Sequence, residues 1–310
     1  MAKKTPKERT QENKCEKKLN RFLILYNMNT NSNVYTVIYS TVLVVVVAAI
    51  LAFAAEGLKD KQNENVKLET ITKVLTAAAQ ADDNFSITED TDILATYRDK
   101  AVDAYYIDCD GNKVGESMNL GKEDLKAIQV ASTSDLKKQN DIIKKVEAGN
   151  ADAAKELRLP VYVFDIAGKT VTVIPCYGAG LWGPVWGYLA FDEDGRTFDG
   201  AIFDHKSETP GLGAKIAEEP FYSQFKGHRL TDNGHFDVVK GGARGDIHGV
   251  DAISGASITS KAVGTTINTW VKYYLPYLNG IAAKKAAPAE TETNDEATTE
   301  TAAETENVEE

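Results

Sequence analysis

Two hydroxyl groups stand three residues apart, at Ser254 and Ser257, in the stretch that begins at Asp251. Apolar residues at three- and four-residue spacing follow, which predicts an amphipathic helix starting near Ser257. The free N–H groups of a first helical turn, and the positive end of the helix dipole, favour an anion and phosphate above all. The stretch therefore predicts either a phosphate site or a helix cap supplied by Ser257, Thr259 or Ser260.

Three further segments place flexible backbone beside side chains suited to ligand contact. Gly178–Gly187 combines glycines with Trp182 and Trp186, and an exposed indole offers a flat surface to an aromatic ligand. Glu208–Gly213 is a tight turn with a hydroxyl and several backbone donors, and Lys240–Ala243 sets a cation beside two glycines. Taken alone, each segment is equally explained as a turn, with the tryptophans in the core.

Patterns typical of other enzyme classes are missing from the sequence. The residues around Ser257 lack the final glycine of a nucleophile elbow, and Lys261 follows that serine by four residues where a Ser-x-x-Lys motif needs three. The histidines have no HExxH spacing, and no GxGxxG follows a strand in a βαβ unit, so neither a metalloprotease site nor NADH binding is predicted. The net charge of -11 argues against a nucleic-acid partner.

From Val34 to Ala55 the chain carries no charge over 22 residues. As a helix this segment is ~33 Å long, enough to cross a bilayer core of ~30 Å. A cleaved signal peptide is the alternative, but its apolar region is shorter, at ~7–15 residues. Residues 1–21 hold eight Lys/Arg against three Glu, a net of +5, so the N-terminus is expected in the cytoplasm and the rest outside it. Cys15 is then in a reducing compartment, whereas Cys109 and Cys176 are either separate thiols or a disulfide.

Composition divides the chain into five segments. Residues 1–33 are predicted to form a basic cytoplasmic N-terminus, 34–55 a transmembrane helix and 56–94 a stalk helix. Residues 95–280 are predicted to form the folded domain. Residues 281–310, rich in Ala, Thr and Glu, have too little apolar surface to offset chain entropy and are predicted to be a disordered acidic tail.

Within residues 95–280, short β-branched or aromatic runs are separated by Asp/Gly turns, which is the signal of hairpins. The predicted strands are Ala104–Ile107, Val161–Phe164, Val171–Ile174, Trp186–Phe191 and Ala201–Phe203. A helix is predicted over 135–154. The turns 108–111 and 192–195 resemble part of a calcium loop but lack its full ligand pattern. The mixture predicts an α+β fold with an antiparallel sheet and separate helices.

The pattern Asp251-x-x-Ser-Gly-Ala-Ser257 resembles the flavinylation signature of FMN-binding domains, in which the last Ser or Thr carries FMN. With the Gly-x-Gly-Leu-Trp, Glu-Thr-Pro-Gly-Leu-Gly and Lys-Gly-Gly-Ala segments, in this order, the chain to about residue 280 resembles the NqrC family, the C subunits of sodium-translocating NADH:quinone reductases. The stretch Gln62-x-x-Asn65 after the apolar run also resembles that family. The G subunit of the related Rnf complex shares the flavin motif but fits the N-terminal stretch less well. The usual acceptor in the family is Thr, and this chain has Ser257.

This resemblance implies that Ser257 carries FMN through its phosphate, and that a flavin transferase using FAD and Mg²⁺ installs it. It places Trp182 close to the flavin ring and Lys240 near the ring or the phosphate. It also assigns residues to the lining of the FMN site, namely Glu208, Thr209, Leu212 and Gly213. It implies that four further residues present the acceptor serine to the transferase: Asp251, Ser254, Gly255 and Ala256. No catalytic acid–base pair and no metal site is implied.

The function implied by the resemblance is that of an electron relay with covalent FMN in a sodium-pumping NADH:ubiquinone or menaquinone oxidoreductase. Its expected partners are the other subunits of that complex, the flavin transferase and the membrane. The expected location is the inner membrane, crossed once, with the FMN domain in the periplasm. Two alternatives stay open: a G subunit of the Rnf complex, and a non-redox ligand-binding module.

Overall fold

The computed structural model describes residues 33–118, 125 and 128–286. The predictions for the basic N-terminus, for Cys15 and for the acidic tail from residue 287 onward lie outside the described residues. The chain divides into two compact units, one ending at Asn63 and the other starting at Glu64.

One helix, α2 (Asn33–Ala79), covers the predicted membrane segment and continues through the first part of the predicted stalk. Its apolar window is long enough to cross a membrane, and no part of that window is buried within the protein. Ser40 and Thr41 donate their hydroxyl hydrogens to backbone carbonyls one turn earlier, at 2.8 Å in each case. Such internal pairing removes unsatisfied donors from a lipid-facing surface. This first unit therefore has the features of a membrane anchor.

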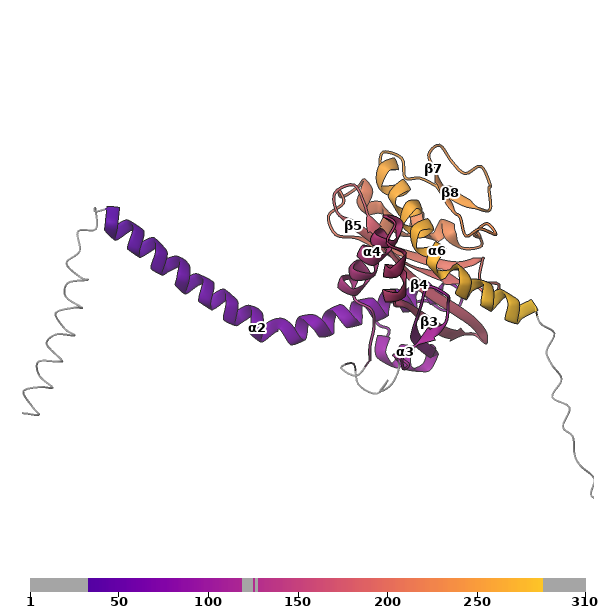
Figure 1. Ribbon diagram of the computed structural model, residues 1–310, viewed down its shortest axis with the longest axis horizontal. Helices are drawn as coiled ribbons and strands as arrows, with labels where there is room; N and C mark the ends of the chain where they lie inside the picture. Colours follow the sequence, from indigo (N-terminus) through magenta and orange to yellow (C-terminus); the bar gives the residue numbers. More distant parts are fainter. Residues whose placement is uncertain (1–32, 119–124, 126–127, 287–310) are drawn as a thin grey trace, which may run out of the picture. The chain divides into compact units, whose positions relative to one another are not determined.

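The second unit is built on a six-stranded antiparallel sheet with the order β2-β1-β3-β4-β5-β6. Figure 1 labels β3, β4 and β5 of this sheet. Its strands are β1 (Ala101–Ile107), β2 (Lys113–Val114), β3 (Leu159–Ile166), β4 (Lys169–Ala179), β5 (Pro184–Phe191) and β6 (Phe198–His205). The helices of this unit are the end of α2, from Glu64 onward, and α3 (Ile93–Lys100), α4 (Thr133–Glu147), α5 (Glu219–Tyr222) and α6 (Ser257–Ala286). Two further strands, β7 (Asp237–Val239) and β8 (Gly249–Asp251), form a separate parallel pair.

A hydrophobic core lies on each face of the sheet. On one face α4 and α6 supply Ile143, Ile267 and the fully buried Trp270. On the other, the end of α2 supplies Ile71 and Leu75, which pack with α3 against the sheet. Because both faces are covered, the central strands are buried along most of their length and read as continuous apolar runs. The second unit is thus α+β, which confirms the predicted fold class.

The five predicted strands all lie within β1 and β3–β6, each of which extends beyond the predicted run at one end or at both. The predicted helix over 135–154 is shorter than expected. It ends at Glu147, and a separate 3₁₀ segment covers Ala151–Glu156. The interruption falls at Gly149 and Asn150, two poor helix formers.

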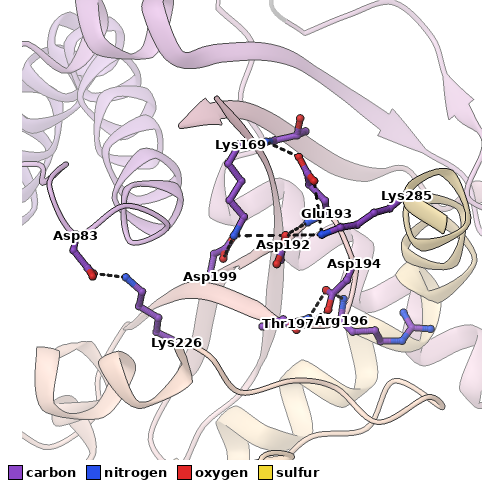
Figure 2. Close-up of polar contacts among 11 residues, drawn as sticks. Asp83, Lys169, Asp192, Glu193, Asp194, Arg196, Thr197, Asp199, Lys226 and Lys285 are labelled. Carbon is purple, nitrogen blue, oxygen red and sulfur yellow. Dashed lines mark hydrogen bonds and ion pairs between the residues drawn. The ribbon is translucent and has the colours of Figure 1, made fainter. Parts of the chain in front are cut away.

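In the acidic turn Asp192–Gly195, between β5 and β6, the carboxylates form hydrogen bonds and ion pairs with other groups of the protein (Figure 2). Asp194 accepts hydrogen bonds from the backbone N–H groups of Arg196 at 2.8 Å and Thr197 at 2.7 Å. Lys285, near the end of α6, lies 3.6 and 3.7 Å from the carboxylates of the first two residues of the turn. No group of three His, Cys, Asp or Glu suited to a metal ion exists among the described residues. The segment is the turn predicted from the sequence.

Cys109 and Cys176 are separate free thiols. Cys176 lies in the core, and burial raises the pKa of its thiol to about 12. The second of the two open alternatives, a disulfide between them, is not present.

Candidate functional site

The parallel pair β7 and β8 brings two distant segments to one edge. Val239 and Asp251 are register partners, so Lys240 and the turn before α6 leave the pair side by side. The backbone N–H of Ala252 donates to the Val239 carbonyl at 2.9 Å. The Asp251 carboxylate in turn accepts the backbone N–H of Ala243 at 2.5 Å. Asp251 therefore fixes the Lys240 loop against the start of α6.

The turn before α6 sets the position of Ser257, the first residue of the helix. Gly255 has a φ of +81°, a conformation that other residues adopt at a cost. The Ser260 hydroxyl, fully buried, donates to the Ala256 carbonyl and accepts the Ile253 N–H, both at 3.0 Å. The half-buried Ser257 hydroxyl has no hydrogen-bond partner among the described residues. That hydroxyl is therefore free to react or to contact a ligand.

A buried carboxylate connects the tryptophan loop to the first turn of α6. Glu208, only 4% exposed, accepts the backbone N–H of Trp182 at 2.8 Å with one oxygen and the Thr259 hydroxyl at 2.7 Å with the other. A Cβ at Gly213 would lie 2.6 Å from the second carboxylate oxygen, so this contact needs glycine there. Glu208 thus holds together three segments that are far apart in sequence.

Burial raises the pKa of the Glu208 carboxyl. The carboxylate also accepts hydrogen bonds from the Trp182 backbone, the Thr259 hydroxyl and the neighbouring backbone N–H groups. These bonds favour the ionised form and outweigh the effect of burial, so the pKa of Glu208 lies below its ordinary value. The group is ionised at neutral pH and supplies a fixed negative charge beneath the loop.

We expect Glu208→Gln to make stability less dependent on pH. Because the folded-state pKa is lowered, the ionised carboxylate contributes stability that is fully present above the unfolded value near 4.5 and is lost as pH falls through the folded value. The variant should lose about 1–3 kcal/mol in its free energy of unfolding at neutral pH. Its difference from the wild type should shrink in acid. Urea unfolding across this range, with the exposed Glu218→Gln as control, measures the difference; a difference independent of pH would contradict the assignment.

A cavity of about 380 Å³ lies where these segments meet. Its lining residues are Leu181, Trp182, Glu208, Thr209, Leu212, Gly213, Lys240, Gly255, Ala256, Ser257, Ile258 and Thr259. Much of its apolar lining is exposed: Trp182 at 68%, Ile258 at 64%, and Leu181 and Leu212 at 45% each. A free hydroxyl, a cation and an apolar rim therefore share one opening, an arrangement suited to a flat ring that carries a phosphate.

Nine of the predicted FMN-site residues line this cavity, and two do not. Asp251 and Ser254 lie outside the lining, and Asp251 acts on it through the Lys240 loop. The sequence reasoning missed Leu181 and Ile258 and treated Thr259 only as a possible cap. Leu181 and Ile258 are sequence neighbours of the predicted site residues Trp182 and Ser257. This adjacency was the signal in the sequence that could have identified them.

Residues 180–272, which include the entire cavity lining, match the FMN-binding domain family. The chain is also 30% identical over 235 residues to the C subunit of the Na(+)-translocating NADH-quinone reductase of Vibrio vulnificus, covering 73% of this chain and 86% of the relative. This chain belongs to the NqrC family. It is an FMN-binding, membrane-associated subunit of a sodium-translocating NADH-quinone reductase.

Other members of the NqrC family agree with this assignment. The C subunit of the Vibrio anguillarum reductase is 29% identical over 253 residues, covering 78% of this chain and 92% of the relative. The crystal structure of the same subunit from Parabacteroides distasonis superposes with a TM-score of 0.54 at 30% identity, covering 71% of this chain and 96% of that one. The matches to NqrC proteins, together with the FMN-binding domain, favour the first interpretation over the Rnf protein and the non-redox module.

Proposed function

We propose that this NqrC protein carries FMN covalently on Ser257 and passes electrons within the reductase complex. The observation that supports the proposal is the position of the Ser257 hydroxyl, which is unpaired among the described residues and lines a cavity shared with Lys240 and Trp182. A hydroxyl at the first residue of a 30-residue helix also lies at the positive end of its dipole. Both features suit a phosphoester.

Attachment requires a donor and a leaving group. In the proposed step a flavin transferase, with Mg²⁺, presents FAD to Ser257. The Ser257 oxygen forms a bond to the phosphorus of the FMN half, the bond from that phosphorus to the AMP half breaks, AMP leaves, and the hydroxyl proton is released. No electron transfer is involved. The half-buried Ser257 and the exposed Ile258 beside it are consistent with access by a second protein.

The residues of this chain bind and orient the cofactor, and FMN when bound supplies the redox chemistry. Lys240, which lines the same cavity, would offset the charge of the phosphate. Trp182 and Leu212, also in the lining, would cover part of the ring and exclude water from it. Glu208 holds the Trp182 loop in place through the backbone, with both carboxylate oxygens already engaged. The chain itself therefore needs no acid–base pair.

The test of attachment is mass spectrometry of the tryptic peptide that contains Ser257. That peptide should gain the mass of FMN less one water, with fragment ions that assign the addition to Ser257. Modification of Ser254, Thr259 or Ser260, with Ser257 unmodified, would refute the assignment.

We further propose that residues 34–55 span the inner membrane, with 1–33 in the cytoplasm and the FMN domain, 95–280, in the periplasm. The positive charge of residues 1–21 supports this orientation. A membrane-impermeant thiol reagent added to intact cells with a permeable outer membrane should label the partly exposed Cys109 and spare Cys15. The reverse pattern would invert the topology.

A further inference from the structure

Two charged side chains of opposite sign line the cavity proposed to hold FMN, and they differ in burial. They are the carboxylate of Glu208 and the ammonium of Lys240. Glu208 is 4% exposed, whereas Lys240 is an exposed residue that forms no ion pair with any described residue. Water and salt screen an exposed charge much more than a buried one. The negative charge of Glu208 therefore dominates the electrostatic field inside the cavity.

The carboxylate of Glu208 is already hydrogen-bonded on both oxygens. One oxygen accepts the backbone N–H of Trp182 at 2.8 Å, and the other accepts the Thr259 hydroxyl at 2.7 Å. The backbone N–H groups of Leu181 and Gly183 also donate to this carboxylate. With its acceptor positions occupied by the protein, the group acts on a ligand in the cavity through its charge rather than through a hydrogen bond.

Close backbone approach fixes where this charge lies. A Cβ at Gly180 would lie 2.6 Å from one carboxylate oxygen of Glu208, and a Cβ at Gly213 would lie 2.6 Å from the other. Glycine at both positions therefore leaves room for the carboxylate between the Trp182 loop and the first turn of α6. These are the two segments that carry Trp182, proposed to contact the flavin ring, and Ser257, proposed to carry the phosphate.

The size of the cavity limits the distance between this charge and a bound ligand. A sphere with the cavity volume of about 380 Å³ is about 9 Å across, close to the Debye length of ~8 Å at physiological ionic strength. Salt therefore screens only part of the interaction. Reduction adds negative charge to a flavin ring, and a fixed carboxylate at this range opposes that addition.

We propose that Glu208 sets the reduction potential of the FMN in this protein: its charge makes the flavin harder to reduce and, once reduced, a stronger electron donor. The inference rests on the proposed FMN site, but not on the covalent bond to Ser257. Glu208 is in this sense a positioning residue for the Trp182 loop and a source of charge for the cofactor.

Glu208→Gln removes the charge and retains the two side-chain contacts. The amide oxygen accepts the Trp182 N–H, and the amide nitrogen donates to the Thr259 oxygen, since a hydroxyl both donates and accepts. The measurement is a spectroelectrochemical titration of the bound flavin in the full chain in detergent. At a given solution potential the ratio of reduced to oxidised flavin should be about tenfold higher in the variant, which is ~30 mV for a two-electron step. An unchanged or lower midpoint potential would overturn the proposal.

Three further variants separate charge from structure. Glu208→Asp keeps the charge but is too short to reach both partners, so its midpoint should stay near the wild-type value. Glu218→Gln removes the same charge from an exposed residue outside the cavity and should have no effect. Lys240→Gln removes the opposite charge and should lower the midpoint by a smaller amount, because Lys240 is exposed. A shift in Glu208→Asp equal to that in Glu208→Gln would assign the effect to lost contacts and contradict the proposal.

The result is distinguishable from the outcome for Ser257. FMN bound to this protein has a midpoint potential wherever it is attached, whereas the covalent bond is tested by the fluorescent band on a denaturing gel. A normal band in Glu208→Gln with an unshifted midpoint would refute only the role of Glu208. Far-ultraviolet circular dichroism of each preparation verifies that folded proteins are compared.

Discussion

Ser257→Ala should remove all covalent flavin from this protein. The alanine has no oxygen to form the phosphoester, so the fluorescent flavin band on a denaturing gel should fall to background. The Ser257 hydroxyl has no partner among the described residues, so its loss should change the free energy of unfolding, compared with flavin-free wild-type protein, by no more than about 0.5 kcal/mol. Absence of flavin from a chain with an unchanged melting temperature identifies a lost attachment point rather than a lost fold.

Two further substitutions complete that experiment. Ser257→Thr keeps a hydroxyl at the same helical position and should keep the fluorescent band. Thr265→Ala removes an exposed hydroxyl two turns further along α6 and should also keep it. A fluorescent band that persists in Ser257→Ala would place the flavin elsewhere.

The second large effect is expected in the assembled complex. If FMN on Ser257 is an intermediate carrier, its loss interrupts electron flow after another subunit has already oxidised NADH. The Ser257→Ala complex should therefore still pass electrons from NADH to an artificial soluble acceptor at close to the wild-type rate. It should fail to reduce quinone and to transport sodium, because those steps lie beyond the missing carrier.

Both activities must be measured on the same purified preparation, so that loss of another subunit does not imitate the result. The Ser257→Thr complex serves as the control and should recover quinone reduction together with flavin. Quinone reduction at the wild-type rate, with flavin shown to be absent from this protein, would mean that the relay role is wrong. Loss of both activities would point to failed assembly, which a denaturing gel of the preparation reveals as missing subunits.

Local sequence patterns were sufficient to predict many of the structural elements and site residues of this protein. The uncharged run from Val34 to Ala55 predicts a membrane helix from its length alone, because hydrophobic thickness translates directly into residue number. The strands were found because β-branched runs between Asp/Gly turns are a local signal. Ser257, Trp182 and Lys240 were singled out because their motifs are contiguous in sequence, and the structure places all three around one cavity.

Contacts between distant segments were decided only by the tertiary structure. Nothing around Glu208 indicates that its two oxygens would bond to Trp182 and Thr259, which lie 26 and 51 residues away. Likewise the sequence gives no sign that the Asp251 carboxylate accepts the Ala243 N–H of the Lys240 loop, a contact made possible by the parallel pairing of β7 and β8. These strands have three residues each, too few for a reliable periodic signal.

A cavity of about 670 Å³ between α4 and the end of the β4–β5 hairpin has the same origin. Lys137 and Lys144 read in sequence as the solvated face of a helix, and Trp186 reads as a core residue of a strand. Only the packing of α4 beside the β4–β5 hairpin gathers them with Lys206 around one space. Sequence patterns with helical or strand period specify which face of an element is apolar. Which polar faces meet depends on the path of the whole chain, because those contacts join residues without any fixed spacing.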